Sequence, residues 1–337
     1  MGARRVSALV LVLALAMGAE PSSARVEVEI HQKRFEAGPP RYSVPLSIDG
    51  GAPIEAMLDT GSTGLRVLPS AGPLTAKGVR PDRYVYRNGV VMTGAITPVR
   101  VGIGGLQVKV DVSATSAVAC SQDRPSCPAA AIPTQQYRIG GSTPSDGFSA
   151  ILGAGLRAGE AENPLAHLGE QAWIVLLPKP GDAAPGKLIL NPTPAERARF
   201  TLFSLTRDTR RRGDFWADNT VPTCLSRDGA GAPLCAPTLL DSGAAGLNYI
   251  SRSAPAFDDW PTDTSVNLRF GPPGSTAMSQ SFVLGRGPAR LNFSTPPASL
   301  PWEGLNAGVL PFYDFAVLYD AKGGQIGLAP RGDFSAP

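Results

Sequence analysis

The chain has 337 residues, of which 43% are hydrophobic and 18% charged, and its formal net charge is +3. This apolar content suffices for two domains or one large two-part unit. The basic residues form no stripe interleaved with aromatics, so the sequence argues against a nucleic-acid partner. The 38 glycines and 33 prolines are spread along the whole length, which interrupts long helices and favours short strands joined by turns.

The N-terminus has the pattern of an export signal. Two arginines precede an apolar stretch, residues 6–19, and the small residues Ser22 and Ala24 fit a cleavage site. We therefore expect residues 1–24 to be a signal peptide and the mature chain to be periplasmic or secreted. The apolar stretch is too short for a comfortable membrane span, and no later segment is apolar enough, so we predict no membrane span.

The four cysteines fall into two local pairs, Cys120 with Cys127 and Cys224 with Cys235. In an oxidising compartment such cysteines form disulfides, and local pairing is the connectivity that we favour among the three possible ones. Metal binding is the alternative. It would need C-x-x-C spacing or nearby histidines, and the two histidines of the chain lie far from the cysteines in sequence. We predict two disulfides, no metal site and no cofactor.

Strand-like segments dominate the chain. The predicted strands are Val26–Ile30, Tyr42–Ile48, Ala56–Leu58, Gln107–Val112, Trp173–Leu177 and Lys187–Leu190. The last two flank the turn-rich stretch Pro178–Gly186 and therefore predict a hairpin. Helical periodicity is confined to Pro164–Leu168 and Pro194–Arg199, each long enough for one short helix. The pattern is that of an all-β protein.

An internal repeat is the most informative feature. LDTGSTGL at Leu58–Leu65 and LDSGAAGL at Leu240–Leu247 share leucine, aspartate and glycine at matching places, and each copy follows an apolar run. The spacing between the copies is far too long for a solenoid. We interpret the repeat as two related lobes that each present one loop. The alternative is a pair of turns at the contact between lobes.

Each copy can place a carboxylate at a tight turn. Gly61 and Gly243 allow the backbone to approach closely, so that its N–H groups can donate to Asp59 and Asp241. If the loops meet, the two carboxylates cannot both ionise easily and share one proton. The ionised member can take a proton from a bound water while the protonated member polarises a carbonyl group. This pair can hydrolyse a peptide bond by general acid–base catalysis.

Other segments extend the pattern beyond the two loops. They are DGFSAILGAG (Asp146–Gly155), the hairpin Trp173–Asn191, the cysteine-flanked run Cys224–Gly243 and FAVLYDAKGGQIGLAP (Phe315–Pro330). Together with the Asp loops they resemble the pepsin-like aspartic proteases over nearly the whole mature chain. The resemblance implies a pepsin-like fold, with two β-barrel lobes related by a pseudo-twofold axis around a central cleft. The lobes would span residues 25–191 and 192–337.

The resemblance also implies a function and its residues. It implies an aspartic endopeptidase that acts on a peptide or protein substrate as a monomer, with Asp59 and Asp241 as catalytic residues. The residues that support this pair would be Thr60, Gly61, Ser62, Ser242, Gly243 and Ala244, the Thr60 and Ser242 hydroxyls bracing the opposite loop. YRNGVVMTG at Tyr86–Gly94 resembles the hairpin flap over the cleft, with Tyr86 as the flap tyrosine and Gly89 in its turn. The short interval before Asp59 predicts no long inhibitory prosegment.

Three positions depart from the family pattern. Arg66 stands where a tryptophan usually supports the flap tyrosine, and Pro311 stands where the strand behind Asp241 has glycine. Ala244 cannot donate a hydrogen bond as Ser62 can at the first loop. Because a donor to the charged form lowers a pKa, its absence predicts a higher pKa for the pair and activity at weakly acidic pH.

Other functional motifs are incomplete. GFSAI at Gly147–Ile151 lacks the closing glycine of a nucleophile elbow. GAGLRA at Gly153–Ala158 loosely matches a dinucleotide fingerprint, but no βαβ pattern surrounds it. The alternative that stays open is a non-catalytic module of the same fold that binds a peptide or protein in the cell envelope. Retention of both aspartates and both glycines favours the enzyme.

Overall fold

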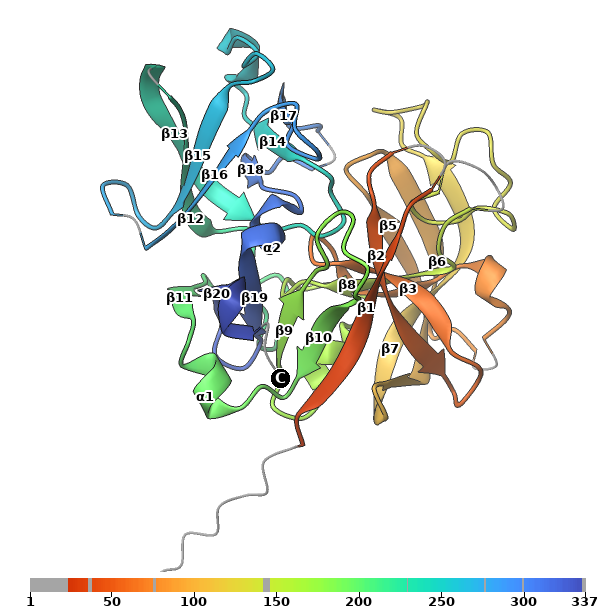
Figure 1. Cartoon of the computed structure of the whole chain (residues 1–337). Coiled ribbons are helices and arrows are strands. Elements are labelled where there is room, and N and C mark those ends of the chain that lie inside the picture. Colours follow the sequence, from red (N-terminus) through yellow and green to blue (C-terminus); the bar gives the residue numbers. More distant parts are fainter. Residues whose placement is uncertain are drawn as a thin grey trace, which may run out of the picture.

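The computed structural model describes residues 24–35, 38–74, 77–141, 146–228, 230–275, 277–298 and 300–334. Strands make up most of the regular structure in these ranges, which confirms the all-β class (Figure 1). The predicted signal peptide lies outside the described residues apart from Ala24. None of the helices in the described ranges is long and apolar enough to cross a membrane.

The larger sheet of the described chain contains thirteen strands. Their order is β11 (Thr201–Ser204), β20 (Gln325–Pro330), β19 (Phe315–Asp320), β9 (Ala172–Leu176), β10 (Gly186–Leu190), β1 (Val26–Lys33), β2 (Arg41–Ile48), β3 (Ile54–Asp59), β8 (Ala150–Ala154), β4 (Thr63–Val67), β7 (Leu106–Cys120), β6 (Val90–Ile103) and β5 (Arg80–Val85). Strands β9 and β10 pair antiparallel, which confirms the predicted hairpin. Because β9 also pairs with β19, this sheet holds strands from both sides of the predicted lobe boundary.

The smaller sheet has seven strands within the described ranges. Their order is β16 (Met278–Val283), β15 (Ser265–Phe270), β12 (Val221–Arg227), β13 (Ala230–Leu239), β18 (Gly304–Asn306), β14 (Leu247–Ile250) and β17 (Leu291–Ser294). Figure 1 shows this sheet on one side of the molecule, strands β2 to β8 on the other, and β9, β19 and β20 between them at the base. The strands that carry the two Asp loops therefore come from the two sides.

Two short α-helices accompany the strands in the described ranges, α1 (Pro194–Arg197) and α2 (Leu310–Asp314). The α1 helix lies in the predicted segment and begins at a capping box formed by Thr193 and Glu196. The other predicted helix is a 3-10 turn, Pro164–His167. Each disulfide joins the predicted local pair: Cys120 with Cys127 after β7, and Cys224 with Cys235 across β12 and β13.

The repeat in the sequence corresponds to a repeat in the topology. Strand β3 runs into Asp59 and pairs in parallel with β8, which pairs antiparallel with β4. Strand β13 precedes Asp241 and pairs in parallel with β18, which pairs antiparallel with β14. Strands β4 and β14 each pair in parallel with one further strand, β7 and β17. The two Asp loops therefore leave equivalent strands in the two halves.

The leucines of the repeat anchor both loops in the core. Leu58, Leu65, Leu240 and Leu247 are each at most 1% exposed and belong to one apolar cluster that spans both halves. Burying a leucine side chain stabilises the folded state by about 1.5–3 kcal/mol. Because one leucine precedes and one follows each loop, the polar residues between them are held at a defined place above the core.

Candidate active site

The two Asp loops meet and are joined by reciprocal hydrogen bonds. The Thr60 hydroxyl donates to the carbonyl of Leu240 at 2.8 Å and accepts from the backbone N–H of Ser242 at 2.9 Å. The Ser242 hydroxyl donates to the carbonyl of Leu58 at 2.8 Å and accepts from the N–H of Thr60 at 3.0 Å. Each hydroxyl satisfies two backbone groups of the opposite loop. These backbone groups need such partners because they are buried away from water. The loops are thereby fixed relative to each other.

The carboxylates of Asp59 and Asp241 face each other across this contact. The N–H of Gly61 donates to Asp59 Oδ1 and the N–H of Gly243 donates to Asp241 Oδ1, each at 2.9 Å. A Cβ atom on Gly61 would overlap the carboxyl group of Asp241, and one on Gly243 would meet that of Asp59. Glycine is therefore required at both positions because the opposite carboxylate lies against its Cα.

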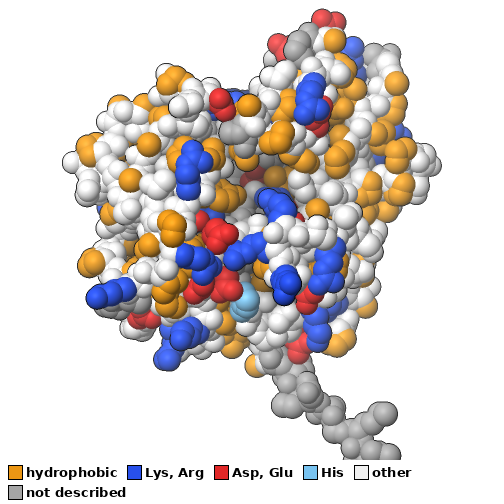
Figure 2. Space-filling model, turned by 180° about the vertical axis from the view of Figure 1, so that it is seen from behind, with side chains coloured by type: hydrophobic (Ala, Val, Ile, Leu, Met, Phe, Trp, Pro, Cys, Tyr) orange, Lys and Arg blue, Asp and Glu red, His pale blue; other side chains and the backbone are white. Residues whose placement is uncertain are grey.

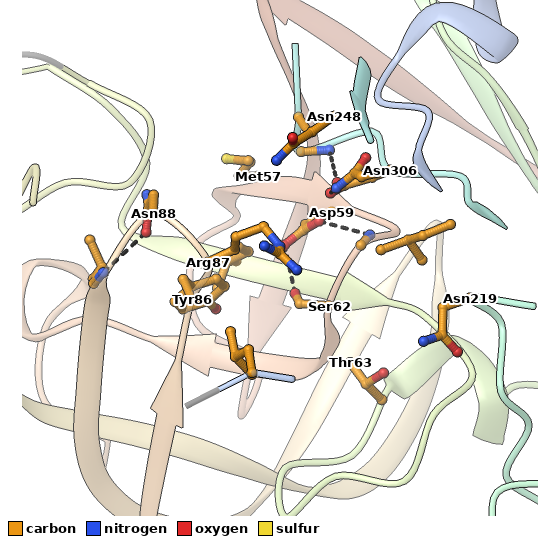
Figure 3. A pocket seen from close by; sticks show the side chains of 18 of the residues that line it. Met57, Asp59, Ser62, Thr63, Tyr86, Arg87, Asn88, Asn219, Asn248 and Asn306 are labelled. Atoms are coloured by element: carbon orange, nitrogen blue, oxygen red, sulfur yellow. Dashed lines mark hydrogen bonds between the residues drawn. The ribbon is translucent and has the colours of Figure 1, made fainter. Parts of the chain in front are cut away.

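Each carboxylate also accepts a side-chain hydrogen bond. Ser62 Oγ donates to Asp59 Oδ2, and Asn306 Nδ2 donates to Asp241 Oδ2, both at 2.6 Å. Asn306 lies on β18 and faces the same space as Asp59 (Figure 3). The expectation that Asp241 lacks a second donor is thus corrected. Ala244 supports the loop through its backbone, where its carbonyl accepts from the N–H of Val309 at 2.9 Å.

A glycine that follows β18 lies behind Asp241 at the position equivalent to the glycine behind Asp59. In the first half Asp59 pairs with Gly153 on β8. In the second half the N–H of Asp241 donates to the carbonyl of Gly308 at 3.4 Å. Pro311 lies in the first turn of α2, where the missing N–H of proline is not needed. Gly308, three residues before Pro311, therefore occupies the glycine position. The assignment of that position to Pro311 is wrong.

Burial and the neighbouring negative charge change the titration of Asp59. Burial, the larger cause, and the charge of Asp241 raise the pKa of Asp59 to about 7. The hydrogen bonds from Ser62 and Gly61 act in the opposite direction and lower it. Asp59 is 6% exposed and Asp241 is 9% exposed. Two carboxylates in this arrangement hold one proton between them over a wide range below neutral pH.

A cleft of about 1560 Å³ opens above the two carboxylates and is lined by residues of both sheets. It exceeds the roughly 300–1000 Å³ of a typical small-molecule pocket, so it suits an extended ligand. The turn between β5 and β6 forms part of its lining. Figure 3 shows Tyr86 and Arg87 on this turn, pointing toward Asp59 and Ser62.

The turn between β5 and β6 is closed by hydrogen bonds at Tyr86 and Gly89. The N–H of Tyr86 donates to the carbonyl of Val90 at 2.8 Å, and the N–H of Gly89 donates to the carbonyl of Tyr86 at 2.9 Å. Gly89 has a φ of +91°, a conformation that favours glycine. Burial raises the pKa of the Tyr86 phenol, and its hydroxyl has no hydrogen-bond partner among the described residues.

Arg66 supports this hairpin indirectly. Its fully buried guanidinium lies 3.6 Å from the ring centre of Tyr84, in cation–π geometry, and donates to the carbonyl of Thr63 at 2.7 Å. The Tyr84 ring in turn meets the Tyr86 ring edge to face at 4.8 Å. Arg66 therefore acts on Tyr86 through Tyr84, a contact that the sequence alone did not indicate.

Two further arginines hold the glycines of the loops, and sequence reasoning missed both. Arg157 Nη2 donates to the carbonyl of Gly61, and Arg41 Nη1 donates to that of Gly243, each at 2.6 Å. Arg157 also forms an ion pair with Asp218, which is 1% exposed. Arg157 lies in the GAGLRA segment, three residues after the end of β8. This closeness in sequence to the strand behind Asp59 was the one signal that could have placed Arg157 at the site.

Comparisons of the chain with protein-family models and with curated proteins found no match. The assignment of a function therefore depends on the geometry of this site.

Proposed function

We propose that the chain is an exported aspartic endopeptidase with a pepsin-like fold, in which Asp59 and Asp241 are the catalytic residues. The observation that carries this proposal is the meeting of two equivalent Asp loops, locked by the reciprocal Thr60 and Ser242 hydrogen bonds, at the base of a large cleft. The equivalent strand pairings of the two halves support two lobes related by a pseudo-twofold axis. The two disulfides support a periplasmic or secreted location.

The proposed reaction uses both carboxyl groups and one water molecule. The ionised carboxylate accepts a proton from a water bound between the two groups, and the water oxygen attacks the scissile carbonyl carbon. The protonated carboxyl group donates its proton to the carbonyl oxygen. The tetrahedral intermediate then collapses: the carboxyl group that was protonated by the water gives its proton to the amide nitrogen as the C–N bond breaks, and one hydroxyl group of the intermediate returns its proton to the other carboxylate. The products are a carboxylic acid and an amine, and the pair again holds one proton.

The hydrogen bonds around the pair suit this chemistry. Each carboxylate accepts from one backbone N–H and one side chain, so its orientation toward the cleft is fixed before a substrate binds. Such preorganisation avoids reorganisation during the reaction. The hairpin with Tyr86 lies beside Asp59 in the cleft (Figure 3) and would exclude bulk water from a bound peptide.

The test is cleavage of casein by the purified protein, with pepstatin as inhibitor. We expect the wild type to cleave casein and Asp59→Asn and Asp241→Asn each to lose at least about 100-fold in rate, because general acid–base catalysis contributes about 10²–10⁴-fold. Asp259→Asn, which changes an exposed carboxylate outside the cleft, is the control and should cleave normally. Cleavage by Asp59→Asn near the wild-type rate would contradict the proposal. Pepstatin binding without any cleavage would favour the non-catalytic binding module.

A further inference from the structure

Six arginines line the cleft without a carboxylate partner in the part of the chain that the structure describes. They are Arg34, Arg41, Arg83, Arg87, Arg124 and Arg290. The described lining holds no lysine or glutamate, and its aspartates are the catalytic pair and Asp208, which is paired with Arg210. Figure 2 shows the molecule hollowed between its two halves, with basic side chains around the hollow. The walls of the cleft therefore carry an excess of positive charge.

Arg87 directly follows Tyr86, the proposed flap tyrosine, in the sequence. It lies in the turn between β5 and β6 and points from there toward Asp59 (Figure 3). Its Nη1 atom is buried and has no hydrogen-bond partner among the described residues. A buried donor without a partner is unfavourable, and more so when the group is charged, so this position favours a ligand that accepts from it.

The surroundings of Arg87 select the charge of that ligand. Burial and the like charge of Arg124 both lower the pKa of Arg87, whereas the negative charge of Asp241 acts in the opposite direction. A carboxylate bound between Arg87 and Arg124 would neutralise this repulsion and accept from the buried donor. The guanidinium group can bind a carboxylate through two parallel hydrogen bonds, which a neutral amide cannot match.

We propose that this cleft takes peptides with an acidic side chain close to the scissile bond, and that Arg87 binds the carboxylate of that side chain. The inference rests on the proposed endopeptidase function and names its substrate class. A charge-assisted hydrogen bond in a buried site corresponds to about a 10- to 100-fold preference for glutamate over glutamine at that position. The preference requires an ionised glutamate, so it disappears when the pH falls below about 4.

The test compares glutamate with glutamine in otherwise identical peptides. A positional octapeptide library, with each position carrying either residue, is cleaved by the wild type, by Arg87→Gln and by Arg212→Gln. Arg212 is exposed and lies outside the cleft, so its variant makes the same charge change elsewhere. We expect a kcat/KM ratio of about 10 to 100 in favour of glutamate at one position for the wild type and Arg212→Gln. Arg87→Gln should bring that ratio close to one.

A binding measurement separates this inference from the proposed function. The same library is bound to the Asp59→Asn variant, with and without Arg87→Gln, and the retained peptides are identified by mass spectrometry. Arg87-dependent retention of glutamate peptides supports the inference even if the wild type cleaves nothing, an outcome that counts against the endopeptidase alone. Equal binding of glutamate and glutamine peptides at every position overturns the inference. So does an equal loss of cleavage for both peptides in Arg87→Gln, because Arg87 would then act on the catalytic pair rather than on the substrate.

Discussion

Asn306 donates a 2.6 Å hydrogen bond to Oδ2 of Asp241 and so takes the place that a hydroxyl at position 244 would take. The equivalent donor at the first loop, Ser62, belongs to the loop itself. Both carboxylates thus have one backbone and one side-chain donor although the loop sequences differ. Ala244 therefore does not leave Asp241 without a side-chain donor. The expectation that Ala244 raises the pH range of activity does not hold.

Loss of Asn306 should move the pH range upward. The amide donates to the charged form of Asp241, so Asn306→Ala raises the pKa of the pair, and the upper limb of the kcat/KM profile should rise by about one pH unit. The double variant Asn306→Ala with Ala244→Ser supplies a hydroxyl in the loop and should move the limb back. The measurement is the pH–rate profile on one peptide substrate. An upper limb that stays in place or moves down in Asn306→Ala would show that this amide does not set the pKa of the pair.

The raised pKa of Asp59 should make the protein less stable as the pH rises. This carboxyl group titrates near 3.8 when unperturbed and near 7 in the folded protein. Between these values the unfolded chain has lost a proton that the folded protein keeps. The stability from this group is thus fully present below about pH 4 and is lost as the pH rises through 7, at no more than about 1.4 kcal/mol per pH unit.

Asp59→Asn removes this titration and should flatten the decline in the free energy of unfolding between pH 4 and pH 7. Denaturant unfolding at several pH values measures it. Asp259→Asn, an exposed aspartate, should keep the wild-type slope. An identical slope in the wild type and Asp59→Asn would show that the pKa of Asp59 is close to its unfolded value.

The Thr60 hydroxyl should matter more than its methyl group. Thr60→Val keeps the shape but leaves the N–H of Ser242 without a partner and the carbonyl of Leu240 with only the 3.3 Å hydrogen bond from the Tyr319 hydroxyl. An unsatisfied buried group costs about 1–3 kcal/mol, so the free energy of unfolding should fall by about that amount. We also expect kcat to fall with little change in KM, because the carboxylates lose their alignment. Thr60→Ser keeps the hydroxyl and should lie close to the wild type in both measurements. If Thr60→Val and Thr60→Ser behave alike, the reciprocal hydrogen bonds do not hold the loops.

The buried ion pair of Arg157 and Asp218 should contribute strongly to stability. Asp218 is 1% exposed and also accepts from the N–H of Leu156 at 2.6 Å. Asp218→Asn leaves the guanidinium without its counter-charge, and removal of one partner of a buried pair costs about 3–5 kcal/mol. The exposed pair of Arg207 and Asp214 is the control: Asp214→Asn should cost at most about 1 kcal/mol. Chemical denaturation measures both, and equal losses in the two variants would contradict the prediction.

The local parts of the candidate site could be predicted from the sequence. Asp59 and Asp241 were found because each lies in a short motif whose neighbours act within a few residues: glycines that donate to the carboxylates and leucines that anchor each loop. The disulfides were predicted for the same reason, since each joins cysteines close together in the chain. The all-β class followed from alternating apolar residues and frequent turns, which are also local properties.

The partners that come from distant segments could not be predicted, because they depend on how the strands pair in the folded chain. Asn306 reaches Asp241 because β18 pairs with β13, and the register of that pairing also places Gly308 rather than Pro311 behind the carboxylate. Arg41 reaches Gly243 from β2, and Arg157 reaches Gly61 from the segment that follows β8. A single arginine or asparagine has no periodic or motif signal in a sequence, because its role is set by the atoms that packing places against it.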